Sequence, residues 1–585
     1  MRVVVRRSLI VVALVAGIAA AVASAAVGSA RRSSQESVTT SVLMPGVTYT
    51  REVDFTLRGP IVLDVVTAPK PDGALYSLAP GLSNNQLRGT ESLAKLDGRV
   101  AAGSTSVAID GDYFDGTGAP SGIYLANGVL DSAPGDGRSS LGIAADGTLT
   151  TGRVSLAGIW QGNSQRRPLF LNTGTGKFNL YTPVYGGATP RESGVVEAVL
   201  GSFPHAQLNT PLDGTVTRVT TAGPTTIPPG GAVIVARGSQ STAQLKAEAP
   251  VGQKVEAQLS LSPDWSNLAS AIGGGPLLVR NGKPIFHAGE SFQPRQLNGR
   301  QPRGAIGQLA DGRIVLVGVE GTRPSYSIGM SNYELGVELS RLGATTAFGL
   351  GSGSAAGIAF DGGLLTRPSG ATVPKVSDAL VLSYSGIYAA PPSTSVLSPN
   401  HDGLDDVETL SYRVVRSSHV VATLAGPGGS KVTVADAAES PGLHTFAWNG
   451  IAAGSVAPEG RWTFTVTGTD DRKVTTSAQR TFSLDDTLSS LALQLGAAGL
   501  PTATFQLTRP AKLLVQIARP TGVPVATLRS GPAAAGPVQV TWRGRRGKRR
   551  VRGGHYEVVV KATSSVGTSS LAALFSYRRS RHKHH

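Results

Sequence analysis

The segments AIGGGPLLVRNGKP (residues 271–284) and PRGAIGQLADGRIVLVGVEG (residues 302–321) carry the most specific pattern in this chain. The first contains three consecutive glycines: Gly273, Gly274 and Gly275. Because glycine has no Cβ, a second backbone or a ligand can approach such a run closely. We therefore expect a binding site here, and the alternative is a tight glycine turn without a ligand.

The second segment predicts a β-hairpin. Apolar residues at 305–309 and 314–320 flank an Asp-Gly pair, which is a strong turn signal between two strands. Arg303 and Glu320 then lie at the opposite ends of this hairpin. A guanidinium and a carboxylate framing one hairpin are parts of a site for an anionic substrate.

One amphipathic helix follows the hairpin. Ser331 is the expected N-cap, Glu334 completes a capping box, and leucines recur at helical spacing until Gly343 ends the helix. The apolar run at 345–350 predicts a buried strand that delivers a small-residue loop. The candidate substrate-binding residues in that loop are Ser352, Gly353 and Ser354.

The order of these motifs resembles the phosphodiester glycosidases related to the lysosomal uncovering enzyme, N-acetylglucosamine-1-phosphodiester alpha-N-acetylglucosaminidase. Members carry GGGP-L, R-T-A-I-G, D-G-R-Q-P, Y-S-x-G-M and L-D-G-G-G-S-S segments, and this chain matches most of them in order. The resemblance runs from about residue 64 to residue 388. It implies a glycan or phosphodiester-linked sugar as substrate, with Arg303 and the glycine N–H groups holding the phosphate.

A second informative stretch, VAIDGDYFD, places two acids after an apolar run. Asp110 and Asp112 lie two residues apart, so on a strand they face the same side. They could share a proton, hold a hard cation or stabilise a positive transition state. The alternative is that they cap a turn and pair with Arg303 or a backbone N–H group. With Glu320 they are the candidate acid, base or nucleophile of a glycosidase.

The final loop departs from the family pattern, because Gly351 stands where the family has an aspartate and Ala355 and Ala356 follow instead of hydroxyl residues. Glycine cannot replace a carboxylate in acid–base chemistry. Asp361, ten residues further on, is a candidate substitute and completes the catalytic set. Two functions remain open: an active hydrolase, or an inactive relative that binds a glycan or a cell-wall polymer.

The N-terminal 30 residues predict a signal peptide, with early arginines, an apolar stretch and Ala-Ser-Ala as cleavage site. The competing interpretation is an uncleaved anchor. The chain has 585 residues and no cysteine, so an exported form holds its fold by core packing alone. We expect a bacterial secreted or envelope-associated protein, and no thiol nucleophile or cysteine metal site.

After the domain at residues 31–390 and a linker at 391–397, two segments share their landmarks. Gly442, Trp448 and Gly460 recur at equal spacing as Gly536, Trp542 and Gly554. We predict two all-β immunoglobulin-like sandwiches, at 398–484 and 485–577, with both tryptophans in the cores. The fold class is thus α+β, with a β-rich glycosidase-like domain followed by these sandwiches.

The first repeat begins with SPNHDGLDD and resembles the immunoglobulin-like domain of flagellar hook-capping proteins. Its oxygen ligands suit Ca²⁺, and the alternative is an Asx-rich turn. The candidate ligands are Asn400, Asp402, Asp405 and Asp406. No other cofactor is expected.

The net charge of +16 is concentrated near the C-terminus. RGRRGKRRVR at 543–552 and the tail at 578–585 contain many cations and no acid. In an exported protein such basic patches favour an anionic cell-wall polymer or a membrane surface over nucleic acid, because no aromatic interleaving accompanies them. The alternative is a solvated loop and a frayed tail.

Overall fold

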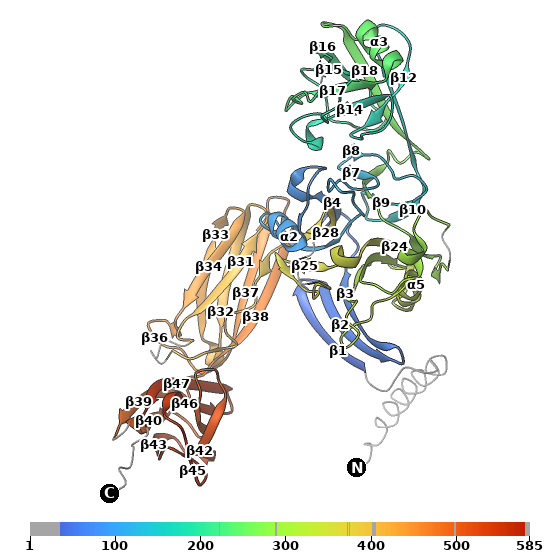
Figure 1. Cartoon of the computed structure of the whole chain (residues 1–585). Coiled ribbons are helices and arrows are strands. Elements are labelled where there is room, and N and C mark those ends of the chain that lie inside the picture. Colours follow the sequence, from blue (N-terminus) through green and yellow to red (C-terminus); the bar gives the residue numbers. More distant parts are fainter. Residues whose placement is uncertain are drawn as a thin grey trace, which may run out of the picture. The chain divides into compact units, whose positions relative to one another are not determined.

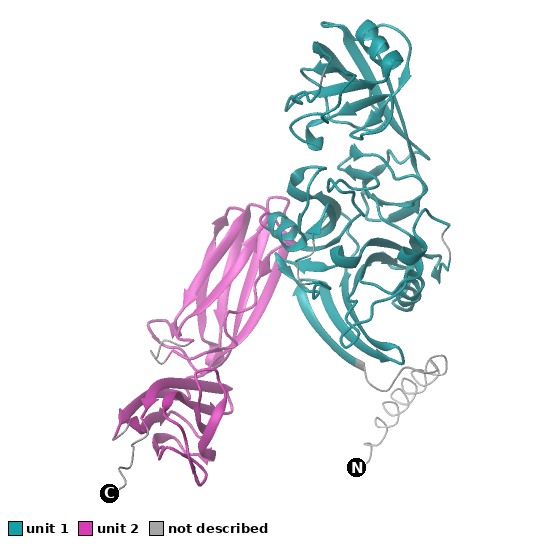
Figure 2. Ribbon diagram, in the orientation of Figure 1, with its two compact units in different colours: residues 1–101, 106–384 teal, residues 102–105, 385–585 magenta. Residues whose placement is uncertain are grey.

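The computed structural model describes residues 36–221, 223–286, 289–370, 373, 375–399, 405–496 and 499–578. The predicted signal peptide lies outside these residues. The chain divides into two compact units, one of residues 1–101 and 106–384 and the other of residues 102–105 and 385–585 (Figure 2). Among the described residues, no helix has the length and apolar character needed to span a membrane.

Unit 1 is β-rich, as predicted, and its central feature is an eight-stranded sheet (Figure 1). Its strands, in spatial order, are β1 (Glu36–Met44), β2 (Val47–Thr56), β3 (Gly59–Ala68), β23 (Ile314–Val319), β22 (Arg303–Leu309), β24 (Ala344–Ser352), β20 (Leu277–Arg280) and β21 (Lys283–Pro284). Helix α5 (Asn332–Arg341) packs on this sheet through Leu335 and Leu339. The sheet is held by burial of aliphatic side chains on the face under the helix.

Two smaller sheets complete the part of unit 1 that carries the site. One has the order β26 (Gly363–Leu364), β25 (Ile358–Phe360), β6 (Thr105–Asp110), β28 (Asp378–Tyr384) and β4 (Tyr76–Leu82), and α2 (Leu93–Ala101) packs against it. The other has the order β10 (Leu149–Gly152), β9 (Ser140–Ala144), β19 (Leu268–Ile272), β7 (Tyr124–Ala126) and β8 (Val129–Ser132). Strand β6 is buried along its whole length, which explains its apolar run.

A second eight-stranded sheet in unit 1 has its own core around Trp160 and Phe178. Its order is β12 (Arg167–Pro168), β11 (Ser155–Gln161), β18 (Lys254–Ser262), β16 (Leu212–Thr220), β15 (Val195–Leu200), β17 (Ala232–Arg237), β14 (Phe178–Tyr181) and β13 (Phe170–Leu171). Helix α3 (Ser239–Glu248) contributes Leu245 to this core.

The predicted hairpin and helix are confirmed. Strands β22 and β23 pair antiparallel, with Arg303 opposite Val319, and the turn contains Gly312 at φ +85°. Arg303 and Glu320 are the ends of the hairpin in sequence, and in space both lie at its open end. Ser331 caps α5 by accepting a hydrogen bond from the Glu334 N–H, and Glu334 reaches back to the Ser331 N–H to complete the capping box.

Unit 2 contains two pairs of sheets, each pair around one hydrophobic cluster. The first pair is β29 (Tyr388–Ala389), β31 (Glu408–Val414) and β34 (Gly442–Trp448), with β30 (Val396–Leu397), β38 (Thr475–Leu484), β37 (Gly460–Asp470), β32 (Ser418–Ala425) and β33 (Lys431–Glu439). The second pair is β39 (Leu488–Leu495), β40 (Pro501–Leu507) and β43 (Gly536–Thr541), with β42 (Pro524–Ala533), β41 (Ala511–Ala518), β46 (Gly554–Thr563) and β47 (Thr568–Tyr577). Trp448 and Trp542 are buried in the two clusters, which confirms their predicted core positions.

Candidate active site

Three strand ends of unit 1 meet at the Asp110 side chain. Strand β6 ends at Asp110, and the strands that carry Gly304 and Gly351 run beside it. A Cβ added at Gly304 would lie 2.4 Å from Asp110 Oδ1, and a Cβ added at Gly351 would lie 2.6 Å from Asp110 Oδ2. The carboxyl group therefore occupies space that any side chain at either glycine would need.

Asp110 is only 1% exposed. Its Oδ1 accepts a hydrogen bond from the Gly357 N–H at 3.0 Å, and its Oδ2 has no partner among the described residues. Burial raises the pKa of Asp110 well above its ordinary value, and the charge of Asp378 adds to this effect. Burial therefore favours the protonated form of Asp110.

Asp112 belongs to a buried pair of carboxyl groups with Asp378. The Asp112 N–H donates to Asp378 Oδ1 at 2.7 Å, and Asp112 Oδ1 accepts from the Tyr113 N–H at 2.7 Å. Burial, together with the neighbouring charge, raises the pKa of Asp112 to about 8, and burial raises the pKa of Asp378 to about 6. Between these values the pair holds one proton and one negative charge.

Sequence reasoning missed Asp378. It is the first residue of β28, a strand that is otherwise apolar and buried except at Ser383. An acid at the start of such a strand is a signal, because a buried carboxyl is costly without a role or a partner. A proton shared between Asp110 and Asp112 was one of the alternatives that the sequence left open. In the structure Asp112 is paired with Asp378, which comes from a distant strand.

The glycine run at 273–275 makes room for carboxyl groups. A Cβ at Gly273 would lie 2.3 Å from Asp112 Oδ2, and one at Gly275 would lie 2.8 Å from Glu290 Oε2. The Gly273 N–H donates to Ile123 O at 2.8 Å and the Gly275 N–H donates to Gly349 O at 2.8 Å. These two N–H groups therefore bind backbone, and the run contributes to the site through the close approach it permits.

Arg303 is 2% exposed and anchors the backbone around it. Its Nε donates to Met330 O at 2.7 Å, and its Nη2 donates to Gln296 O at 2.7 Å and Gly299 O at 2.8 Å. Burial lowers the pKa of Arg303 to about 10, so the guanidinium is still charged at neutral pH. Arg303 thus places a buried positive charge near Tyr113, the residue that follows Asp112.

A second arginine, which sequence reasoning did not select, also lies beside Tyr113. The Arg138 guanidinium stacks on Phe292 at 4.5 Å and on Tyr113 at 5.2 Å from the ring centroids. Its Nη1 is buried without a hydrogen-bond partner among the described residues. An unsatisfied buried guanidinium nitrogen is costly, so it is available to an anionic ligand.

Tyr113 connects the two arginines. Burial raises its pKa, while the Ser352 hydroxyl and the charges of Arg303 and Arg138 oppose that rise. Ser352 lies opposite Arg303 in the pairing of β22 with β24. The structure thus brings together Asp112, Arg303 and Ser352 from the predicted set, and adds Tyr113, Arg138 and Asp378.

Glu320 lies in a different buried network. Arg51 Nη1 donates to Asp64 Oδ1 at 2.8 Å and to Glu320 Oε1 at 3.0 Å, and the Arg367 N–H donates to Glu320 Oε1 at 2.8 Å. Tyr326 contacts Arg51. Burial raises the pKa of Asp64 to about 7. The tyrosine and arginine partners hold this carboxyl pair within the sheet of β2, β3 and β23.

Asp361, Gly353 and Ser354 lie in the turns that follow β25 and β24. Asp361 (φ +49°) and Gly362 form the turn between β25 and β26, where the Asp361 N–H donates to Ser106 O at 3.1 Å. After Ser352, a short 3₁₀ turn begins at Gly353, whose N–H donates to Pro302 O at 3.0 Å. Ser354 is exposed.

Two of the predicted calcium ligands, Asn400 and Asp402, lie outside the described residues. Asp405 and Asp406 are described, and the Asp405 carbonyl accepts from the Ser398 N–H at 2.8 Å. Within the described residues no group of three histidine, cysteine or acidic side chains is placed to hold a metal ion.

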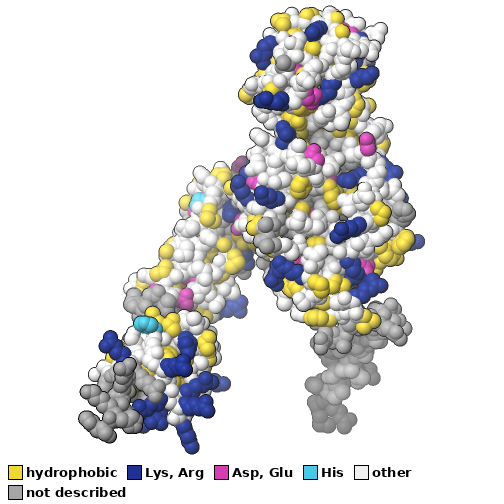
Figure 3. All heavy atoms as spheres, in the orientation of Figure 1, with side chains coloured by type: hydrophobic (Ala, Val, Ile, Leu, Met, Phe, Trp, Pro, Cys, Tyr) yellow, Lys and Arg dark blue, Asp and Glu magenta, His cyan; other side chains and the backbone are white. Residues whose placement is uncertain are grey.

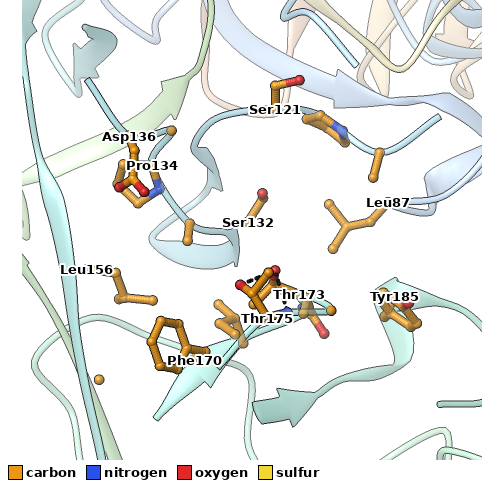
Figure 4. Close-up of a pocket in the computed structure, with 18 of the residues that line it drawn as sticks. Leu87, Ser121, Ser132, Pro134, Asp136, Leu156, Phe170, Thr173, Thr175 and Tyr185 are labelled. Carbon is orange, nitrogen blue, oxygen red and sulfur yellow. Dashed lines mark hydrogen bonds between the residues drawn. The ribbon is translucent and has the colours of Figure 1, made fainter. Parts of the chain in front are cut away.

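A polar cavity of about 700 Å³ adjoins the Asp112 loop (Figure 4). Figure 4 shows Phe170, Thr173 and Thr175 on one side of the cavity and Ser121 on the other. Ser121 and Gly135 line it, and between them and Asp112 lies Gly122, whose added Cβ would be 3.0 Å from Asp112 Oδ2. Many hydroxyl groups with aromatic rings at the rim suit an uncharged, hydroxyl-rich chain such as a glycan.

Residues 205–383 match the family model described as phosphodiester glycosidase. This part of the chain is therefore similar to a phosphodiester glycosidase domain. Among solved structures, a hypothetical protein from Synechocystis is similar at 27% identity with a TM-score of 0.50, over 59% of this chain and 64% of that one. This chain thus spans less than two thirds of that relative.

Two further solved structures are similar at lower identity. A Burkholderia pseudomallei protein described as exported is 22% identical, with a TM-score of 0.45, over 56% of this chain and 74% of that one. The zebrafish N-acetylglucosamine-1-phosphodiester alpha-N-acetylglucosaminidase catalytic domain is 13% identical, with a TM-score of 0.33, over 60% of this chain and 87% of that one. No curated protein matches the chain.

Proposed function

We propose that this protein is an exported hydrolase that cleaves a sugar–phosphodiester bond in an envelope or extracellular glycan. The observation that carries the proposal is the cluster of a carboxyl pair, Asp112 and Asp378, with two arginines, Arg138 and Arg303, around Tyr113. The match of residues 205–383 to the phosphodiester glycosidase model supports the same reaction class. Export rests on the N-terminal sequence.

The arginines hold the phosphate in this proposal. Arg138 Nη1 has no hydrogen-bond partner among the described residues. Arg303 contributes its positive charge, and its Nε and Nη2 are held by three backbone carbonyls. A phosphate leaving group needs its negative charge stabilised as the C–O bond to the sugar breaks. Two positive charges in a largely water-excluded site provide that stabilisation.

The carboxyl pair handles the proton. Hydrolysis adds water, so one proton must leave the attacking oxygen while the sugar–oxygen bond breaks. Near neutral pH the Asp112–Asp378 pair carries one negative charge, which the higher pKa of Asp112 leaves on Asp378, so the pair can accept that proton at Asp378. The proton then leaves to solvent, and the pair returns to its starting state.

The cavity lined by Ser121, Thr173 and Thr175 is where the sugar chain beyond the cleaved bond would lie. Its hydroxyl-rich lining carries two acids, Asp115 and Asp136, and no basic residue. Such a surface disfavours a second phosphate and accepts neutral sugars. We therefore propose a substrate whose phosphate lies at the arginines and whose neutral glycan portion extends into the cavity.

Release of sugar from a panel of α-glycosyl phosphodiesters tests this proposal. Asp112→Asn and Arg138→Gln should each reduce turnover at least about 100-fold, because each removes a group that acts in the transition state. Asp131→Asn is the matched control, since burial also raises the pKa of Asp131, to about 7, and no described hydrogen bond joins its side chain to the cluster.

The opposite outcome favours the alternative function. A protein without turnover on the whole panel that still binds glycan, with binding weakened by Thr173→Val or Phe170→Ala, would be an inactive relative that binds glycan. The loop residues Gly351, Ala355 and Ala356, which lack the family's acid and hydroxyls, are what this alternative rests on.

A further inference from the structure

A small hairpin occurs at the same place in both repeats of unit 2. In the first repeat, β35 (Ile451–Ala452) and β36 (Ser455–Val456) pair as Ile451 with Val456 and Ala452 with Ser455. In the second, β44 (Arg545–Arg546) and β45 (Arg549–Arg550) pair as Arg545 with Arg550 and Arg546 with Arg549. Each hairpin begins three residues after the core tryptophan and has the same register.

The two hairpins are attached to their sandwiches by equivalent hydrogen bonds. Trp448 Nε1 donates to Ile451 O at 2.8 Å, and Trp542 Nε1 donates to Arg545 O at 3.0 Å. The Ala457 N–H donates to Gly450 O at 2.8 Å, and its counterpart from Val551 to Gly544 O measures 2.9 Å. The backbone construction of this element therefore does not depend on the side chains that it carries.

The side chains differ completely between the two copies. Residues 451–456 are uncharged, whereas residues 543–552 hold seven exposed cations and no acid. These cations are Arg543, Arg545, Arg546, Lys548, Arg549, Arg550 and Arg552. Among the described residues, the side chains of these seven cations form no ion pair and no hydrogen bond. Figure 3 shows Lys and Arg side chains gathered on this part of unit 2.

Like charges this close repel one another, so the cluster lowers the stability of the free protein. The first repeat shows that the fold forms the same hairpin without them. We propose that the β44–β45 hairpin is a binding site for an anionic polymer of phosphodiester-linked units. Arginine suits this ligand because its planar guanidinium binds phosphate oxygens through two parallel hydrogen bonds.

The geometry favours a flexible polymer over a membrane surface. Neighbouring residues in a strand point to opposite faces, so Arg545 and Arg546 project to different sides of the hairpin. The turn consists of Gly547 and Lys548, and no large apolar side chain lies at the tip. A bilayer surface is bound best by cations on one face with apolar anchors beside them. A chain of phosphates can follow both faces.

The test measures binding of the purified protein to poly(glycerol phosphate), with vesicles of phosphatidylcholine and phosphatidylglycerol and with duplex DNA as separate arms. The central variant, called the neutral variant below, carries the residues of the first hairpin in the second. Its substitutions are Arg545→Ile, Arg546→Ala, Arg549→Ser and Arg550→Val. We expect it to bind poly(glycerol phosphate) at least about tenfold more weakly at low salt, because it removes four cations from the contact.

Two further variants make the result specific. Replacing the same four arginines by lysine keeps the charge and should restore most of the binding. Introducing Ile451→Arg, Ala452→Arg, Ser455→Arg and Val456→Arg into the neutral variant moves the cations to the other hairpin and should restore part of it. Turnover of a small soluble phosphodiester should be unchanged in all three, which separates this site from the proposed active site.

Binding that is equal in the parent protein and the neutral variant would overturn the proposal. So would tighter binding to the vesicles or to DNA than to poly(glycerol phosphate). The result expected is weak binding by the neutral variant, recovery of most of the binding in the lysine variant and of part of it in the variant with the moved cations, and a preference for the polymer.

Discussion

Gly351 and Asp110 fill one shared space, because the Cβ that any other residue would add at position 351 lies 2.6 Å from Asp110 Oδ2. Strand β24, which has glycine at position 351, therefore lies against the end of β6, which has the carboxyl group of Asp110. In this chain the carboxyl group beside position 351 comes from Asp110 at the end of β6. The glycine and the aspartate fit each other as a pair.

The first prediction follows from this pair. Gly351→Ala should destabilise the protein by about 1–3 kcal/mol, because it forces two groups into one volume in a packed interior. Combining it with Asp110→Ala should recover part of that loss, which gives a double-mutant cycle with a favourable coupling. Thermal or denaturant unfolding measures both.

Gly230→Ala is the control for this cycle, since nothing lies within 4 Å of the added Cβ and the residue is not at positive φ. It should change stability by less than about 0.5 kcal/mol. If Gly351→Ala were as neutral as Gly230→Ala, the shared space would not exist.

The two arginines at the site should respond differently to mutation. Arg303→Ala removes a buried side chain and its three hydrogen bonds to backbone carbonyls, and should cost roughly 2–4 kcal/mol of stability. Arg138→Ala loses stacking on Phe292 and Tyr113 and should cost less than about 1.5 kcal/mol.

Kinetics and unfolding together check this contrast. On the proposed function, Arg138→Ala should lower kcat/KM strongly while unfolding remains nearly unchanged. An Arg138→Ala protein that unfolds easily and keeps its activity would assign this arginine to structure alone.

The carboxyl pair predicts a shift in pH dependence. Asp378→Asn keeps an oxygen that accepts from the Asp112 N–H but removes the neighbouring charge, so the pKa of Asp112 should fall below about 8. The limb of the pH–rate profile that follows ionisation of Asp112 should move to lower pH. Identical profiles for the parent and Asp378→Asn would remove Asp112 from the titrating role.

Stability should fall as the pH rises from about 5 to about 9. Asp64 and Asp131 have pKa values raised to about 7, Asp378 to about 6 and Asp112 to about 8. A carboxyl whose pKa is raised by folding binds its proton more tightly in the folded state. Its contribution is complete at acid pH and is lost as the pH passes through the raised value.

Melting temperatures across this range measure the effect. The carboxyl groups whose pKa values are lowered, such as Asp146 with about 2, are fully ionised above pH 5 and add no slope there. Asp131→Asn should flatten the decline between about pH 5 and pH 7, where the folded state holds the Asp131 proton and the unfolded state does not. A melting temperature that rises with pH across the range would contradict the raised values.

Local elements could be predicted from the sequence because their signals act over a few residues. The Asp-Gly turn, the Ser331–Glu334 capping box and the Gly343 stop each depend on backbone conformation within one or two turns of chain. The repeat of Trp448 at Trp542 likewise predicted two equivalent cores, because equal spacing of buried aromatic residues requires equal strand lengths.

The membership of the site depended on tertiary structure. Asp112 pairs with Asp378, which lies 266 residues away in sequence, and Arg138 reaches Tyr113 beside Phe292 from another loop. Arg303 begins the β22–β23 hairpin and Glu320 follows its end. Yet Glu320 accepts a hydrogen bond from Arg51, whereas Arg303 donates to the Met330 carbonyl. Sequence spacing gives no information on which of these distant partners a side chain meets.

The sequence by itself thus determined the β22–β23 hairpin, the caps of α5 and the repeated tryptophan positions of unit 2, along with the candidate residue types and the basic segment near the C-terminus. Only the tertiary structure decided which groups lie beside Gly273 and Gly351. The carboxyl group of Asp112 occupies the space beside Gly273, and that of Asp110 occupies the space beside Gly351. The physical reason is that hydrogen bonding and turn formation are local, whereas packing and the burial of charge join residues that the chain brings together only on folding.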